Sequence, residues 1–236
     1  MMVTPNLPKF FAAIDDSEQV GAIQKAQKIK NVRGDYGVKL NLDLILKESS
    51  IISKIAAITG RPVFSDIKMM NGKRTMRELV KAVATEGAIM INAYALADYL
   101  IKGAIEEAKE RGIIVLGVTV TTHYDDDYCI KYFGKNLVDT VEMLAQAALD
   151  NGFHGYIVPG TTLSALSGKP GIKFSSSIRP SWFQDKKTND QKQDAEPAVA
   201  IKSGANVICC GSPIFKSPDP AEALEKILKE IEEANL

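Results

Sequence analysis

Long hydrophobic runs are missing from this sequence. No apolar stretch approaches the roughly 20 residues that a helix needs to span a bilayer. The first six residues contain no basic segment followed by an apolar stretch, so they do not resemble a secretory signal peptide. We therefore expect a cytoplasmic protein that has no membrane partner.

Net charge is missing as well. Lys+Arg and Asp+Glu number 29 each in the 236 residues, so no overall basic field exists to attract nucleic acid or an anionic surface. The 45% of hydrophobic residues is ordinary for a globular protein. The charge balance predicts small molecules or other proteins as partners, and no nucleic acid.

Cysteine is scarce. The three cysteines are Cys129, Cys209 and Cys210, an odd number with two adjacent, which fits neither a disulfide framework nor a metal-ligand spacing. Cys209 and Cys210 end an apolar run, so we expect buried, reduced thiols in a cytoplasmic setting.

Histidine is scarcer still. No Cys, Asp or Glu stands at a metal-ligand spacing from His123 or His154, the only two histidines. The acidic run 125–127 is better explained as a solvated loop than as a site for a hard cation. The sequence contains no defensible Ser-His-Asp or Cys-His arrangement. We expect neither a metal nor a cofactor.

Short apolar runs alternate with longer amphipathic ones along the whole chain, without a linker that would divide it. The predicted strands are 10–14, 37–40, 62–66, 89–92, 114–120, 155–158, 172–175 and 207–210. The predicted helices are 17–29, 75–86, 95–111, 137–151, 196–203 and 219–234. Continuous apolar strands are typical of parallel sheets that are buried on both faces. Eight strand–helix repeats predict an α/β protein with one TIM (β/α)8 barrel domain over residues 1–236. A doubly wound open sheet is the alternative, although no dinucleotide-binding glycine motif or P-loop follows the first strand.

One polar segment, 178–189, has no secondary-structure pattern. A dozen such residues in a compact domain usually form a functional loop or a disordered one.

Charged residues follow the predicted strands at their carboxyl ends, where the active sites of TIM barrels lie. Asp66 and Lys68 are two residues apart, so in an extended strand their side chains point to the same side. Taken alone, this spacing fits a structural ion pair as well as a catalytic pair. Asp15 and Lys39 stand at the equivalent ends of the first two strands, which predicts that two lysines and two aspartates converge at one mouth.

The last two predicted strands end in small residues. Ser175-Ser176-Ser177 and Gly211-Ser212 lie where such barrels commonly bind phosphate through backbone N–H groups, and Arg179 and Gln191 are nearby in sequence. The alternative is that these small residues only form tight turns.

Together, these residues resemble the orotidine 5′-phosphate decarboxylase family over almost the whole chain. The matching segments are Ala12-Ala13-Ile14-Asp15, Val38-Lys39, Asp66-x-Lys68-x-x-Asn71-x-x-x-Thr75, Val118-Thr119-Val120-Thr121-Thr122, Ile178-Arg179-Pro180, Asp190-Gln191, Gly204-Ala205-Asn206 and Gly211.

The resemblance implies decarboxylation of orotidine 5′-phosphate to UMP in pyrimidine nucleotide biosynthesis, by a lyase without a cofactor. It implies that Lys68 is the proton donor and that Asp66 holds it. Lys39 would balance the charges and contact the ribose, and Asn71 and Thr75 would reach the site of a neighbouring subunit in a homodimer. The remaining implied substrate-binding residues are Asp15, Thr122, Arg179, Gln191, Gly211 and Ser212.

This chain departs from the family pattern at several positions. Asn71 replaces the second aspartate of the D-x-K-x-x-D signature, so it contributes no negative charge. Ser212 replaces the arginine that grips phosphate, and Ser176-Ser177 replace Pro-Gly. Two alternatives therefore stay open: a divergent paralogue with altered phosphate recognition, and a non-catalytic nucleotide-binding barrel. Related sugar-phosphate enzymes usually carry Glu with bound Mg²⁺ in place of Lys39, so Thr75 and Lys39 favour the orotidylate branch.

Overall fold

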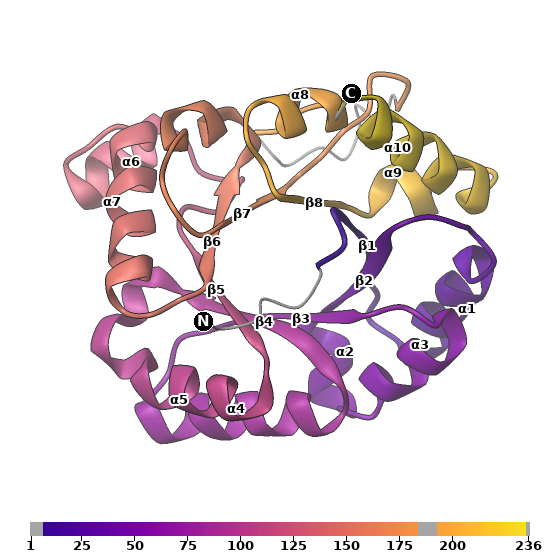
Figure 1. Ribbon diagram of the computed structural model, residues 1–236, viewed down its shortest axis with the longest axis horizontal. Helices are drawn as coiled ribbons and strands as arrows, with labels where there is room; N and C mark the ends of the chain where they lie inside the picture. Colours follow the sequence, from indigo (N-terminus) through magenta and orange to yellow (C-terminus); the bar gives the residue numbers. More distant parts are fainter. Residues whose placement is uncertain (1–6, 184–192, 235–236) are drawn as a thin grey trace.

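Eight parallel strands close into a barrel in chain order in the computed structural model, which describes residues 7–183 and 193–234 (Figure 1). The strands are β1 (Phe10–Ile14), β2 (Tyr36–Asn41), β3 (Val63–Met69), β4 (Ala88–Tyr94), β5 (Ile114–Val118), β6 (Gly155–Pro159), β7 (Ile172–Ser176) and β8 (Val207–Cys210). β8 pairs with β1, and this pairing closes the barrel. The predicted TIM barrel is confirmed.

Helices surround the barrel as an outer ring (Figure 1). They are α1 (Gln19–Ile29), α2 (Leu42–Lys47), α3 (Ile51–Thr59), α4 (Lys73–Thr85), η1 (Ala95–Ile101), α5 (Lys102–Arg111), α6 (Asp126–Phe133), α7 (Leu137–Asp150), η2 (Gly160–Leu166), α8 (Pro197–Lys202), α9 (Ser212–Phe215) and α10 (Pro220–Ala234). α3 and α5 end at Gly60 and Gly112, which adopt the left-handed conformation that glycine tolerates best. No helix among the described residues is long and apolar enough to cross a membrane.

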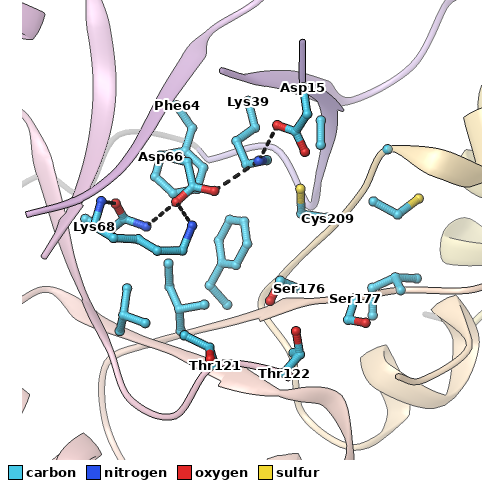
Figure 2. Close-up of a pocket in the computed structure, with 18 of the residues that line it drawn as sticks. Asp15, Lys39, Phe64, Asp66, Lys68, Thr121, Thr122, Ser176, Ser177 and Cys209 are labelled. Carbon is cyan, nitrogen blue, oxygen red and sulfur yellow. Dashed lines mark hydrogen bonds and ion pairs between the residues drawn. The ribbon is translucent and has the colours of Figure 1, made fainter. Parts of the chain in front are cut away.

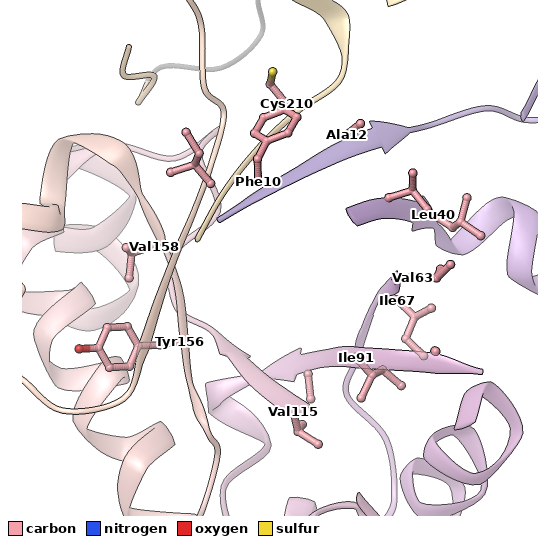
Figure 3. Packing of buried hydrophobic residues seen from close by; sticks show 14 of the residues in the cluster. Phe10, Ala12, Leu40, Val63, Ile67, Ile91, Val115, Tyr156, Val158 and Cys210 are labelled. Carbon is pink, nitrogen blue, oxygen red and sulfur yellow. The ribbon is translucent and has the colours of Figure 1, made fainter. Parts of the chain in front are cut away.

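Each strand is buried on both faces because successive side chains alternate between the barrel interior and the helices. In β1, Phe11 packs in the interior, whereas Phe10 and Ala12 pack in the outer core (Figure 3). Tyr156 on β6 likewise points away from the interior toward the helices (Figure 3). Gly37 on β2 leaves space for the Phe11 ring, which a β-carbon at that position would meet at 2.4 Å. The continuous apolar strands of the sequence therefore reflect two buried layers, one inside the barrel and one between the barrel and the helices.

Several element boundaries differ from those predicted, and three of them matter most. β5 ends at Val118, two residues before the predicted end, and β3 continues beyond Asp66 to Met69. The predicted helix 95–111 begins as the 3₁₀ segment η1, with a kink at Asp98, whose φ is 46°. The helical periodicity of the sequence does not reveal a kink at a single residue.

Sequence analysis missed several short helices. α2 and α3 lie between β2 and β3, where short apolar runs do not distinguish a helix from a strand. The acidic run 125–127 is largely solvated, as predicted, since Asp126 and Asp127 are exposed, but the predicted loop was wrong because α6 begins there. Asp125 is the N-cap of α6, and Asp126 accepts a hydrogen bond from the backbone N–H of Leu137. These carboxylates cap helices, which is a common role for aspartate.

The predicted buried thiols are confirmed, since Cys209 and Cys210 are both free and buried. Of the predicted loop 178–189, the structure describes the part up to Phe183. Residues 184–189 lie outside the described residues. Within the described part, Trp182 donates a hydrogen bond from Nε1 to Glu230 on α10 at 2.8 Å.

Candidate active site

The predicted charged residues meet at the carboxyl-terminal mouth of the barrel. Asp15 directly follows β1, Lys39 lies on β2, and Asp66 and Lys68 lie on β3. The register places Ala13 of β1 beside Lys39 and Asn41 of β2 beside Asp66. The three neighbouring strands therefore present four charged side chains at one end, as the sequence predicted.

These side chains form a row in which the signs alternate (Figure 2). The Lys39 ammonium lies 2.7 Å from Asp15 Oδ1 and 3.0 Å from Asp66 Oδ2, and Lys68 Nζ lies 2.6 Å from Asp66 Oδ1. The side chains of Lys39 and Asp66 are each 11% exposed, whereas those of Asp15 and Lys68 are 53% and 41% exposed. The inner pair is thus buried and the two outer members reach solvent.

The row keeps its inner members charged. Burial raises the pKa of Asp66, but the ammonium groups of Lys39 and Lys68 outweigh that effect and hold the pKa well below its usual range. Burial lowers the pKa of Lys39, but the carboxylates of Asp66 and Asp15 outweigh it and raise the pKa above the ordinary lysine value. Lys39 is therefore a buried cation that is paired with two carboxylates.

Asn92 on β4 is an uncharged residue that hydrogen-bonds to this charged row. It is fully buried, and its Nδ2 donates a hydrogen bond to Asp66 Oδ1 at 2.8 Å. Its Oδ1 accepts hydrogen bonds from the backbone N–H groups of Ile67 and Lys68 at 3.0 and 2.7 Å. Sequence analysis placed Asn92 at a strand end but gave it no role. The only signal was a carboxamide at the end of an otherwise apolar strand.

A cavity of about 300 Å³ opens beside the charged row, with Asp15, Lys39, Asp66 and Lys68 on one side. Its inner end is apolar, because Phe64 and Phe174 pack edge to face there with ring centroids 5.3 Å apart. Thr121, Thr122, Ser176 and Ser177 lie on the opposite side (Figure 2), and Arg179, Gly211 and Ser212 also line the cavity. A ligand with a polar ring and an anionic tail would fit between a charged end and a small, hydroxyl-rich end.

Cys209 also lines this cavity, close to Lys39 (Figure 2). Burial raises the pKa of its thiol to about 12, although the nearby Lys39 ammonium opposes the shift. A thiol with this pKa stays protonated near neutral pH, so Cys209 contributes apolar surface to the cavity rather than a nucleophile.

Arg179 is the guanidinium at the hydroxyl-rich end. Its charged group lies over the Phe183 ring, 5.6 Å from the centroid, and Nε is 3.8 Å from Asp194 Oδ2. Nε is buried and makes no hydrogen bond within the part of the chain that the structure describes. Arg179 therefore has donor capacity left for an anion in the cavity.

Two predicted site residues lie away from the cavity. Asn71 precedes α4 and is exposed, where its Oδ1 accepts a hydrogen bond from the backbone N–H of Gly72 at 2.7 Å. Thr75 lies in the first turn of α4. Neither residue is among those that line the cavity. The last predicted residue, Gln191, lies outside the described residues.

A groove continues from the mouth toward β2 and β4. It shares Asp15, Lys39, Asp66 and Lys68 with the cavity and is bounded on its far side by Leu42 and Tyr94. The charged row of a single chain is thus open on the side of β2 to β4.

Comparison with known proteins identifies relatives that match over most of the chain. The model of a family described as "Orotidine 5'-phosphate decarboxylase / HUMPS family" matches residues 8–227. A protein of Maridesulfovibrio salexigens named orotidine 5′-phosphate decarboxylase is 28% identical over 234 residues, which span 95% of this chain and 99% of that protein. One of Paramagnetospirillum magneticum with the same name is 30% identical, over 94% of this chain and 97% of that protein.

The fold recurs among solved structures. A crystal structure of orotidine 5′-phosphate decarboxylase from Lactobacillus acidophilus superposes with a TM-score of 0.79 and 24% identity, covering 95% of this chain and 99% of that one. At this identity the match establishes similarity of fold.

Proposed function

This chain belongs to the orotidine 5′-phosphate decarboxylase / HUMPS family, and from that premise we propose that it decarboxylates orotidine 5′-phosphate to UMP. The observation that carries the proposal is the alternating row Asp15–Lys39–Asp66–Lys68 at the edge of the cavity. A bare ion pair would have a structural explanation, but four charges of alternating sign at the ends of three strands match a reaction that develops and then neutralises a negative charge.

The reaction breaks the bond between the pyrimidine ring and its carboxylate, which leaves as CO₂. The electron pair of that bond stays on the ring carbon as a carbanion. The Lys68 ammonium stabilises this charge and then transfers a proton to the carbon, so the product is UMP and the lysine is left as a neutral amine. Lys68 is suited to this step because it lines the cavity and is exposed enough to regain a proton from solvent.

The other members of the row hold Lys68 and the sugar. Asp66 keeps the Lys68 ammonium in place through the 2.6 Å contact, and Lys39 balances the negative charge at the second Asp66 oxygen, Oδ2. Asp15, which is half exposed at the mouth, would accept hydrogen bonds from the ribose hydroxyls, with Lys39 beside it. Thr122, on the opposite side of the cavity, would contact the pyrimidine.

The phosphate would bind at the hydroxyl-rich end. Ser212 and Gly211 offer a hydroxyl and a backbone N–H there, and Arg179 supplies a guanidinium whose Nε makes no hydrogen bond within the described residues. A serine hydroxyl cannot replace the bidentate grip of an arginine. We therefore expect phosphate recognition that depends on Arg179.

A homodimer with shared active sites is part of the proposal. Asn71 and Thr75 lie outside the cavity of their own chain, and the groove beside the charged row is open in the single chain. Exposed apolar side chains follow the strands at the same end of the barrel: Leu42, Met70, Leu96 and Tyr99. A second copy that covers these side chains would bring its Asn71 and Thr75 to the groove.

The direct test offers the purified protein orotidine 5′-phosphate, orotidine and orotate separately, and measures the decarboxylated products by chromatography. We expect UMP from the nucleotide, with far slower turnover of the two compounds that lack phosphate, because binding energy from the phosphate is needed to hold the reacting ring. Absence of UMP would refute the proposal.

A divergent paralogue with a different substrate is the second candidate. The specific observation in its favour is the group of small hydroxyl residues, Ser176, Ser177 and Ser212, at the end where phosphate would bind. Thermal shifts with UMP and uridine separate the two. Much stronger stabilisation by UMP supports the nucleotide enzyme, whereas equal stabilisation supports the paralogue.

A further inference from the structure

β3 contains a bulge at the residues that carry the proposed chemistry. Ser65 of β3 pairs with Ile91 of β4, and the next pair joins Met69 to Ala93. Three residues of β3, Asp66 to Lys68, therefore stand opposite the single residue Asn92. Bulges next to active sites commonly re-aim a side chain.

The bulge places Lys68 in an unusual backbone conformation. Its φ is 46°, in the left-handed region that residues other than glycine seldom adopt. Such a conformation persists only where the surrounding structure holds it. The backbone here lacks regular pairing with β4, because the register shifts across these residues.

The side chain of Asn92 replaces the missing backbone pairing. Its carboxamide oxygen accepts both N–H groups that the bulge leaves unpaired, from Ile67 at 3.0 Å and Lys68 at 2.7 Å. Backbone N–H groups only donate, so they fix the amide orientation, with Nδ2 facing Asp66. The same side chain thus holds the backbone of Lys68 and, at 2.8 Å, the Asp66 oxygen that accepts from the Lys68 ammonium.

We propose that Asn92 is a positioning residue of the active site: by holding the Lys68 backbone and the Asp66 carboxylate, it aims the Lys68 ammonium into the cavity. Lys68 is thereby fixed at both ends, by its own N–H group and by the partner of its ammonium. This role rests on the proposed function for its kinetic consequence, but the structural claim about the bulge stands independently of it.

The test compares Asn92→Ala with Asn92→Asp. Alanine removes the acceptor of both N–H groups and the donor to Asp66. Aspartate keeps the acceptor but replaces the donor with a carboxylate that repels Asp66. Ser65→Ala is the matched control, because Ser65 is fully buried on the same strand and its hydroxyl makes no hydrogen bond within the described residues.

Steady-state kinetics with orotidine 5′-phosphate give the first measurement. We expect Asn92→Ala to lower kcat by about a hundredfold with KM changed by less than about threefold. A displaced general acid stabilises the transition state less well, but it has little effect on the affinity for the substrate. Asn92→Asp should also lower kcat, whereas Ser65→Ala should leave it unchanged. A kcat for Asn92→Ala within about twofold of the control would overturn the proposal.

Amide hydrogen exchange gives a measurement that needs no activity. The N–H groups of Ile67 and Lys68 should exchange much faster in Asn92→Ala than in the wild type, and at the wild-type rate in Asn92→Asp. Unchanged protection of the Lys68 N–H group in Asn92→Ala would overturn the claim.

If Asn92→Ala does not fold, Asn92→Asp decides the question. A protected Lys68 N–H group together with a lowered kcat in Asn92→Asp supports the proposal, and a wild-type kcat in Asn92→Asp refutes it. A wild-type protein without turnover would refute the proposed function, and the exchange data would still decide the role of Asn92 at the bulge.

Discussion

Asp66 is the residue on which the charged row depends, since it contacts both Lys39 and Lys68. Asp66→Asn would leave the buried Lys39 with Asp15 alone and Lys68 without its partner. Removing one member of a buried ionic network typically costs about 3 kcal/mol of unfolding free energy. The neighbouring ammonium groups keep the folded-state pKa of Asp66 below the unfolded value of about 3.9.

The pH dependence of this effect follows from the sign of the shift. A carboxyl group with a lowered folded-state pKa stabilises the protein above its unfolded pKa and loses that contribution as the pH falls. We expect the unfolding free energies of wild type and Asp66→Asn to differ by a constant amount between about pH 5 and pH 9, to begin to converge below about pH 4, and to meet only below the folded-state pKa of Asp66. Urea unfolding at several pH values measures this, and a difference that grows toward acid would contradict it.

Glu107 on α5 provides a matched control for Asp66. It is also a buried carboxylate between two cations, Arg77 at 2.9 Å and Arg111 at 2.6 Å, but it lies on an outer helix away from the cavity. The Arg111 and Arg77 guanidinium groups lower its pKa as well. Glu107→Gln should therefore destabilise the protein and leave turnover unchanged, whereas Asp66→Asn, which removes the partner of Lys68, should lower both stability and turnover.

At the scale of elements, β6 and β7 meet at an unusually close backbone approach. A β-carbon on Gly155 would lie 2.2 Å from the carbonyl oxygen of Ile172 and 2.4 Å from its nitrogen. Backbone atoms that pair two barrel strands cannot move aside cheaply. Gly155→Ala should lower the unfolding free energy by about 2 kcal/mol or more, as overpacking does.

Gly72→Ala is the control for this glycine. Its φ of −61° suits any residue, and no atom lies within 4 Å of where the β-carbon would be. Thermal or urea unfolding of both variants gives the comparison. Equal stability of the two would contradict the assigned close approach of β6 and β7.

The strand that carries the chemistry shows how far the sequence leads at this scale. Both side chains reach the mouth, as the spacing of Asp66 and Lys68 predicted, but the extended geometry assumed for that prediction is interrupted at Lys68. The bulge and the continuation to Met69 were not predictable from β3 alone, because they depend on the side chain of Asn92 across the sheet. Short apolar helices such as α3 were missed for a different reason. A short apolar run in the sequence is compatible with either a strand or a helix, and only its packing in the fold distinguishes the two.

At the scale of the whole molecule, the closed barrel was predictable because eight apolar strands recur with helical segments between them. The barrel brings Asp15, Lys39, Asp66 and Lys68 to one end, as expected. It leaves Asn71 and Thr75 outside the cavity. Whether Asn71 and Thr75 reach the cavity of a second subunit depends on the shape of the surface between the subunits. The pattern of strands and helices in the sequence does not predict that surface.

The shared site of the proposed homodimer makes a quantitative prediction. Lys68→Ala and the double variant Asn71→Ala/Thr75→Ala are co-expressed with different tags, and the mixed dimer is purified on both. If Asn71 and Thr75 act across the interface, the mixed dimer has one intact site and should show about half the wild-type activity per dimer, while each variant alone is impaired.

Light scattering on the wild type supplies the control for that experiment, since it must first show a dimer. A mixed dimer no more active than the average of its two parents would place Asn71 and Thr75 in the site of their own chain or outside any site. A monomeric wild type with full activity would also contradict sharing.

The most direct test of the account compares wild type and Lys68→Ala in turnover of orotidine 5′-phosphate and in binding of UMP. With Lys68 as the proton donor, kcat for UMP formation should fall by about a thousandfold in the variant. The affinity for UMP, measured by calorimetry, should stay within a few-fold of the wild type, because Lys68 acts on the reacting carbon rather than on the bound product. A wild-type protein that forms no UMP, or a Lys68→Ala variant that turns over at the wild-type rate, would contradict the account.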